Sequence, residues 1–204
     1  MQELKKIISS KKFYKINSDK TTKELFLLIF PELKNISRVN KLDNQSQNIL
    51  KSKNFDFILS LFLIDKSEDC EFFMFKYNLS NKEKDKINLL NSIFTDDPSI
   101  DFFTKENLSK IMLKNGKENL IDILDFKILI AKKNKNILLS LKKYFLEFEI
   151  PSLPIKGQDL IDKFGLKEGK LLGIILKEIE EHWLNNNFKI SSDQIEDIVK
   201  SKRI

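Results

Sequence analysis

The sequence predicts an all-α protein, a helical bundle body followed by a small C-terminal helix-hairpin tail. Apolar residues recur at helical spacing along most of the 204 residues, whereas the period-two alternation typical of strands is hard to find. Valine, which favours strands, occurs only at Val39 and Val199. Hydrophobic residues make up 41% of the chain, so a packed core is expected rather than disorder.

The first half of the chain is expected to form a series of short helices. Ser18 or Asp19 is placed to cap the second of them, and Pro31 ends it. Ser80 is placed to cap the last. The almost wholly apolar stretch 55–63 predicts a buried helix. The expected helical ranges are 1–9, 19–30, 32–52 as one or two helices, 55–63, 70–77 and 81–94.

The second half continues with longer helices after a break at Asp96-Asp97-Pro98. We expect helices over 101–114 and 118–148, separated by Asn115-Gly116, with 132–136 as a candidate interruption of the second. Pro151 and Pro154 then mark a boundary.

The tail after this boundary reads as a hairpin of two helices arranged around four glycines. Gly157 permits a tight entry to the first helix, and Gly165 ends it in a left-handed conformation. Gly169 opens the second helix. Gly173, inside that helix, is expected to let the first helix approach closely.

The charge pattern favours a polyanionic partner. The formal net charge is +6. Residues 1–53 carry 12 basic and 5 acidic side chains, residues 54–104 carry 5 and 10, and residues 105–149 carry 10 and 6. Lysines that neutralise phosphates release counterions, which favours nucleic-acid binding. The alternative is an ordinary solvated, lysine-rich surface.

A lysine face on the helix expected over 118–148 is the first candidate for RNA contact. On one continuous helix its lysines fall within an arc of roughly 160°, opposite Ile130, Ile137, Leu141, Tyr144 and Phe148. We expect this face to contact phosphate, although a solvated face remains the alternative. Lys167 and Lys170 in the tail are second candidates. The members of the predicted lysine face are Lys127, Lys132, Lys135, Lys142 and Lys143.

No catalytic or metal-binding residue is predicted. His182 is the only histidine, so neither a cluster of histidine ligands nor a triad is indicated. Asp96-Asp97 is read as turn chemistry in preference to a magnesium site. The tail glycines follow no strand and do not form a phosphate cradle. A lone Cys70 and the lack of a long apolar run predict a cytoplasmic protein without a membrane span.

The tail resembles the C-terminal end of bacterial tRNA nucleotidyltransferases, the CCA-adding enzymes and their poly(A) polymerase relatives. Two weaker resemblances lie upstream: residues 3–8 resemble the helix that closes the neck of that family, and residues 28–33 its neck-to-body junction. The residues that fill the family pattern in the tail are Gly157, Asp159, Leu160, Gly165, Leu166, Gly169, Gly173, Leu176, Trp183 and Phe188.

The resemblance implies a tRNA-binding role without a catalytic head. The family's Gly-Gly turn, Asp-x-Asp metal pair and nucleotide-reading motif are not found in this sequence. We therefore expect the end of the neck at 1–35, the body at 36–149 and the tail at 150–204. Magnesium and CTP or ATP would bind a missing head, for which a separately encoded partner is a candidate, while this chain holds the acceptor and T arms of tRNA.

Two other interpretations stay open, a truncated remnant without function and a helical protein-interaction scaffold. The resemblance also predicts that the apolar side of the first helix, Leu4, Ile7 and Ile8, faces absent neck residues. Such a patch would cause dimerisation, aggregation or capture of a head.

Overall fold

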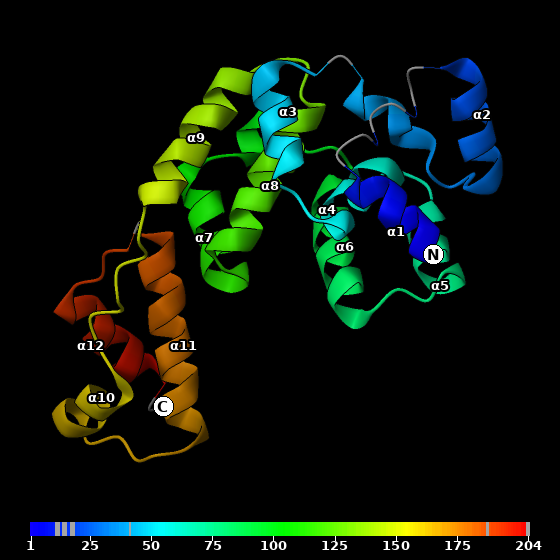
Figure 1. The fold of residues 1–204 in the computed structure, drawn as a ribbon. Coiled ribbons are helices and arrows are strands. Elements are labelled where there is room, and N and C mark those ends of the chain that lie inside the picture. The colour runs from blue at the N-terminus through cyan, green and yellow to red at the C-terminus, as the bar shows by residue number, and fades with distance from the viewer. Residues whose placement is uncertain (11–12, 14–15, 17–18, 41, 187, 203–204) are drawn as a thin grey trace. The chain divides into compact units, whose positions relative to one another are not determined.

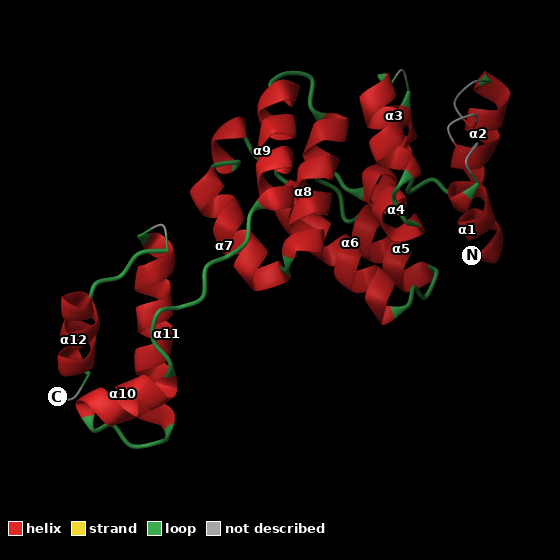
Figure 2. Ribbon diagram, turned by 60° about the vertical axis from the view of Figure 1, so that its left-hand side comes forward, coloured by secondary structure: helices red, strands yellow, loops and turns green. Residues whose placement is uncertain are grey.

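The computed structural model describes residues 1–204 except 11–12, 14–15, 17–18, 41, 187 and 203–204. The described residues form helices and contain no strand, which confirms the predicted all-α class (Figures 1 and 2). The chain divides into two compact units. Unit 1 comprises residues 1–103 and 116–146, and unit 2 comprises residues 104–115 and 147–204.

Unit 1 contains eight α-helices among the described residues and two short 3-10 helices. Its helices are α1 (Gln2–Ser9), α2 (Lys20–Ile29), η2 (Lys34–Val39), α3 (Asn44–Lys51), α4 (Phe55–Leu63), α5 (Asp69–Lys76), α6 (Asn81–Phe94), η3 (Ile100–Phe102), α8 (Lys117–Ile130) and α9 (Lys135–Glu147). The expected boundaries in the first half of the chain agree closely with these helices.

Helix α4 lies at the centre of unit 1. All of its residues from Phe57 to Leu63 are buried, as its apolar sequence predicts. It packs against α1, α5, α6 and η2. Arg38 of η2 donates hydrogen bonds to the carbonyl oxygens of Leu61 (2.9 Å) and Ile64 (2.7 Å). These bonds satisfy acceptors at the C-terminal end of α4, where a positive charge is also favourable.

Side-chain caps set several helix starts, as the sequence predicts. The Asp19 carboxylate accepts a hydrogen bond from the backbone amide of Thr22 (2.7 Å) at the start of α2. Ser80 and Glu83 form a reciprocal capping box at the start of α6. The Ser18 alternative lies outside the described residues.

The expectation of an exposed apolar patch on α1 is wrong. Leu4 and Ile8 are fully buried because α1 packs on α4 within unit 1, and only Ile7 is 37% exposed. The larger exposed apolar side chains of unit 1 lie on α2 and α5 instead.

The segment 118–148 is two helices, not one. Helix α8 ends at Ile130, Ala131 is extended, and Asn134 has a φ of +62° before α9 begins at Lys135. The candidate interruption is therefore confirmed. The break also changes the phase of the second helix, so that Leu138 and Phe145 are buried while Ile137 is 51% exposed. The placement of Ile137 on a core face was wrong because it assumed continuous helical rotation.

Unit 2 consists of α7 (Lys105–Asn115) and the tail helices α10 (Gly157–Phe164), α11 (Lys170–Asn185) and α12 (Ser192–Ser201). The predicted pair α10 and α11 is present, with Gly165 in the left-handed region at the end of α10. Helix α12 is an additional tail helix beyond the predicted hairpin. Its Ile195, Ile198 and Val199 complete a core with Leu160 and other apolar residues of the first two tail helices.

The role predicted for Gly173 differs from the structure. A Cβ atom at Gly173 would meet no atom within 4 Å, so Gly173 does not mediate a close helix approach. Gly157 lies at that contact, because a Cβ there would be 3.5 Å from Leu176 Cδ1 and 3.7 Å from Leu172 Cδ2.

Substitution by alanine is predicted to have opposite effects on stability at Gly173 and at Gly165. Gly173→Ala should stabilise the protein by about 0.5–1 kcal/mol, because alanine loses less backbone entropy in a helix interior and nothing obstructs its methyl group. Gly165→Ala should destabilise it by roughly 1 kcal/mol, because φ is +61° there. Urea unfolding followed by Trp183 fluorescence measures both. A loss of stability in Gly173→Ala would show that this position needs glycine for a contact.

Candidate nucleic-acid interface

Lys127 is occupied by contacts within unit 1. Its ammonium group lies 2.7 Å from Asp97 Oδ1 and donates a hydrogen bond to the carbonyl oxygen of Pro98 (2.6 Å). The same group lies 5.7 Å from the centre of the Phe103 ring, and its side chain is only 12% exposed. Lys127 therefore anchors the Asp97 turn to α8. This contact gives Asp97 a structural role in the turn.

Lys135, at the start of α9, reaches across to the start of α3. Its ammonium group forms an ion pair with Asp43 and a hydrogen bond with Ser46. Asp43 also caps α3 by accepting a hydrogen bond from the Ser46 amide (2.8 Å). The Lys135 ammonium, followed by that amide, lowers the pKa of Asp43 to about 2.

The Asp43 contact predicts a specific pH dependence. Its folded-state pKa lies below the ordinary value of 3.8, so its contribution to stability is present above about pH 4 and is lost as the pH falls through about 2. Asp43→Asn removes the charge and retains a capping side chain. The difference in Tm between the parent chain and Asp43→Asn should therefore shrink between pH 4 and pH 2. A difference that stays constant over this range would contradict the assigned ion pair.

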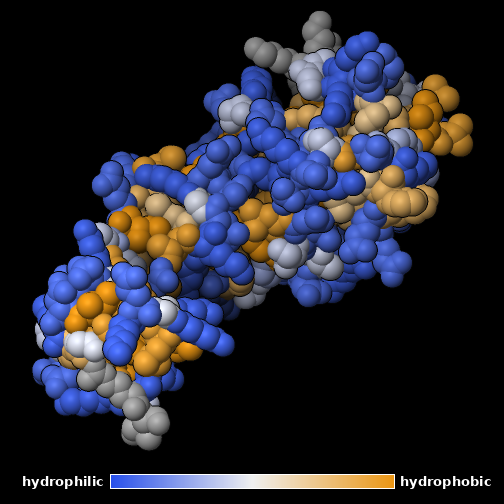
Figure 3. All heavy atoms as spheres, turned by 90° about the horizontal axis from the view of Figure 1, so that it is seen from below, coloured by the Kyte–Doolittle hydropathy of each residue, from blue (hydrophilic) through white to orange (hydrophobic). Residues whose placement is uncertain are grey.

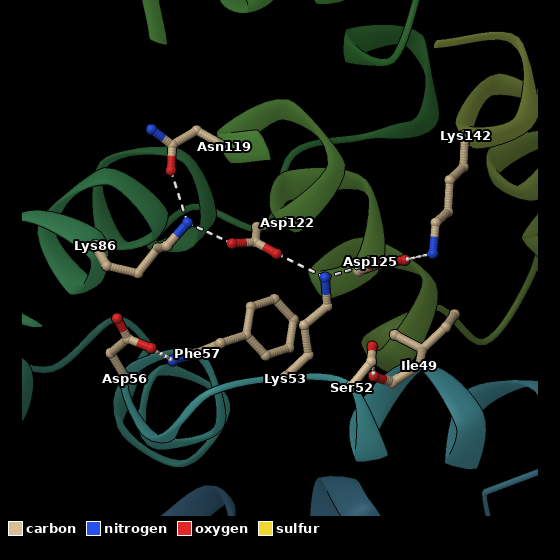
Figure 4. A network of polar contacts seen from close by, with 10 residues as sticks. All are labelled: Ile49, Ser52, Lys53, Asp56, Phe57, Lys86, Asn119, Asp122, Asp125 and Lys142. Carbon is tan, nitrogen blue, oxygen red and sulfur yellow. Dashed lines mark hydrogen bonds and ion pairs between the residues drawn. The ribbon is translucent and has the colours of Figure 1, made fainter. Parts of the chain in front are cut away.

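Lys142, on α9, belongs to a buried network of charges in unit 1 (Figure 4). Its ammonium group lies 2.6 Å from Asp125 Oδ1 and forms an ion pair with it. Asp125 is 1% exposed, and Lys142 is its ion-pair partner on α9. Substitution of Lys142 would unpair a buried carboxylate, so its effect on RNA binding cannot be separated from stability.

The rest of this network joins α8 to α6 and to the turn before α4. Lys53 lies 2.6 Å from both Asp122 Oδ1 and Asp125 Oδ2, and Lys86 pairs with the other oxygen of Asp122. Lys86 also donates a hydrogen bond to the Asn119 side chain (2.6 Å). Burial alone would lower the pKa of Lys53, but the hydrogen bonds to the two aspartates outweigh it and raise the pKa.

The remaining members of the predicted lysine face are free of these contacts. Lys132 lies in the linker between α8 and α9, and Lys143 lies on α9. Both are exposed, and neither forms an ion pair with a described residue. Of the five lysines, the structure thus leaves two exposed on unit 1 without an ion pair to a described residue, together with the neighbouring Lys133. They do not form one face, because the helix that would align them is broken.

The tail lysines form a more compact set. Lys167 and Lys170 are exposed on either side of Gly169, and Lys163 is exposed in the last turn of α10. None of the three forms an ion pair with a described residue. The first turn of α11 contains no acidic residue, so its backbone amides and partial positive charge add to the lysines. We call Lys163, Lys167 and Lys170 the tail-turn lysines.

Lys163 is not among the residues predicted from the sequence, although its spacing in the chain indicates it. It follows the α10 core residue Leu160 by three positions and precedes Lys167 by four, across a turn that Gly165 makes tight. A helix that ends at a glycine, with a lysine before and after that glycine, indicates two lysines at one turn. The overall neutral charge of the segment 150–204 hid it.

Cys70 and His182 do not form part of a metal-binding group among the described residues. Cys70 is buried, and burial raises the pKa of its thiol to about 12, so it is not a reactive thiolate. His182 is exposed on α11. Among the described residues, no three His, Cys, Asp or Glu side chains are grouped to hold a metal ion. Within the same residues, no helix has the length and apolar character needed to cross a membrane.

A family model described as tRNA nucleotidyltransferase domain 2 matches residues 49–199. The chain belongs to that family. The match covers most of the chain, from the end of α3 to α12, and includes all the predicted lysines. It confirms the resemblance to tRNA nucleotidyltransferases that the tail pattern indicates. Neither a curated protein nor a solved structure matches the chain.

Within this tRNA nucleotidyltransferase domain, the described lysines have two different roles. Lys53, Lys86, Lys127, Lys135 and Lys142 hold helices of unit 1 together through carboxylates. The tail-turn lysines and three lysines of unit 1 make no such contacts with described residues and are exposed, the latter being Lys132, Lys133 and Lys143. Helices α1 and α2 precede the matched region, so the assignment of residues 1–35 to a neck is not part of the family match.

Proposed function

We propose that this chain is the tRNA-binding part of a tRNA nucleotidyltransferase, which holds the acceptor and T arms while nucleotides are added at the 3′ end. The observation that carries the proposal is the presence of unpaired tail-turn lysines within a tRNA nucleotidyltransferase domain. Phosphate contacts position a nucleic acid without reading its sequence, which suits a protein that must accept many tRNAs.

The catalytic step is assigned to a head domain outside this sequence. Nucleotidyl transfer uses metal ions to stabilise the attacking and leaving oxygens, and the acidic motif that would bind them is not found in the chain. Magnesium and CTP or ATP would bind that head, and a separately encoded head is the proposed partner. The chain would then contribute the orientation of tRNA relative to the head.

The first test is direct binding of the purified chain to tRNA that lacks its 3′-terminal nucleotides. Affinity should fall steeply between 50 and 200 mM salt and differ little among tRNA species, because the contacts are to phosphate. Filter binding or fluorescence anisotropy measures both properties. Absence of tRNA binding at low salt would favour the scaffold or the remnant over the proposed function.

The second test separates a working component from a remnant. The chain alone should incorporate no labelled CTP or ATP into the shortened tRNA. Addition of a head domain encoded near its gene should restore incorporation, and the restored rate should depend on the concentration of the chain. A head that is equally active without the chain would overturn the proposed partnership.

A further inference from the structure

Helix α5 is apolar on both sides, although only one side is covered by the described chain. Cys70, Phe73 and Met74 are buried against unit 1. On the outer side, Phe72 is 54% exposed and Phe75 is 85% exposed. Large apolar side chains that are exposed together mark an interaction surface. The outer side of α5 therefore has the composition of a contact surface.

Three aliphatic side chains of α2 extend this exposed apolar surface. Leu25, Leu28 and Ile29 are 56%, 79% and 62% exposed. The C-terminal ends of the two helices are tied together, because the Phe30 and Tyr77 rings lie 5.8 Å apart and Lys76 forms an ion pair with the buried Glu32 at 2.8 Å. Figure 3 shows hydrophobic side chains at the surface of this end of unit 1, at the right of the view.

The charges on the outer side of α5 are acidic and unbalanced. Glu68 and Glu71 are exposed and stand at helical spacing from Phe72 and Phe75, so the four residues share one face. Neither glutamate forms an ion pair with a described residue. Of the basic side chains nearby, Lys34 pairs with Asp69 and Lys76 with Glu32, whereas the exposed Lys66 precedes the helix. We call Glu68, Glu71, Phe72 and Phe75 the α5 outer face.

We propose that the α5 outer face, extended by the aliphatic side chains of α2, binds an amphipathic helix of another protein whose apolar side is bordered by lysine or arginine. Exposed rings and aliphatic groups would receive the apolar side of such a helix, as in other helix-in-groove contacts. Glu68 and Glu71 would pair with its basic border and fix its orientation. The same glutamates repel phosphate, so this surface is distinct from the proposed tRNA contacts.

The proposal can be tested with two synthetic helices that differ only in charge. One labelled peptide, about five turns long, carries leucine on one side and lysine on the other, and its counterpart carries glutamate in place of lysine. At low salt the parent chain should bind the leucine–lysine peptide at least about tenfold more tightly, as measured by fluorescence anisotropy. The double variant Glu68→Lys/Glu71→Lys should reverse that preference.

A matched pair of variants tests the apolar part. Phe75→Ser should abolish binding of the leucine–lysine peptide, whereas Ile137→Ser, which removes another half-exposed apolar side chain on α9, should leave it unchanged. Both side chains are exposed, so both variants should keep the circular dichroism spectrum and Tm of the parent chain.

Three results would overturn the proposal. Equal binding of the two peptides would show that the glutamates do not select the partner. Self-association in sedimentation that Phe75→Ser removes would assign the surface to a second copy of the chain. Weaker tRNA binding by Phe75→Ser would assign it to RNA. Loss of peptide binding leaves the tRNA proposal intact, because the tail-turn lysines belong to unit 2.

Discussion

Asp125→Ala should destabilise unit 1 by about 3–5 kcal/mol, the range expected when one partner of a buried ion pair is removed. The substitution leaves Lys142 without a carboxylate and Lys53 with Asp122 alone, although both lysines are mostly buried. For a chain of this length, such a loss corresponds to a Tm lower by roughly 10 °C. Thermal unfolding followed by far-ultraviolet circular dichroism measures it.

Glu118→Ala provides the control for this prediction. Glu118 lies on the same helix and carries the same charge, but it is exposed. Its substitution should change stability by less than about 0.5 kcal/mol. Trp183 is the only tryptophan and lies in unit 2, so its fluorescence follows that unit separately. A Tm change in Asp125→Ala no larger than in Glu118→Ala would mean that water replaces the lost ion pairs.

The double variant Lys167→Ala/Lys170→Ala should weaken tRNA binding and reduce its salt dependence. Each phosphate contact contributes about 0.9 to the slope of log affinity against log salt, so the slope should fall by about 1.8. Between 50 and 200 mM salt, the parent chain should therefore lose about tenfold more affinity than the variant. Both lysines are exposed and unpaired with described residues, so the fold should not change.

Lys66→Ala/Lys82→Ala is the matched control for the tail-turn lysines. Both residues are exposed, make no ion pair with a described residue and lie in the acidic segment 54–104. This variant loses the same net charge, so a general electrostatic effect would appear equally in both double variants. Equal salt slopes for the two variants would show that the tail turn is ordinary solvated surface.

Features that depend on neighbouring residues could be predicted from the sequence. The Asp19 and Ser80 caps, the stop at Pro31 and the left-handed Gly165 arise within one or two helical turns. The buried α4 follows from its apolar composition, and the family pattern of the tail follows from residue spacing. These local signals were sufficient for the all-α class and the family.

The predicted lysine face depended on an assumption that local signals did not support. Its arc required one straight helix over residues 118–148, and the turn through Ala131 and Asn134 resets the rotation. Helix α12 was not singled out, although its Ile195, Ile198 and Val199 are spaced for one buried side. In both cases the apolar residues are spaced for a helix, but the spacing alone does not show where each helix begins and ends.

The sequence by itself determined most of the helices, the α10–α11 pair and the family, because capping, periodicity and motif spacing act over short distances along the chain. Only the tertiary structure decided which lysines are free. Lys53 meets Asp122 across 69 positions, and Lys135 meets Asp43 across 92. No local spacing encodes such pairs, since they form only when separate helices pack together. The same packing leaves the tail-turn lysines without an ion pair to a described residue, and it leaves Phe72 and Phe75 of the α5 outer face exposed.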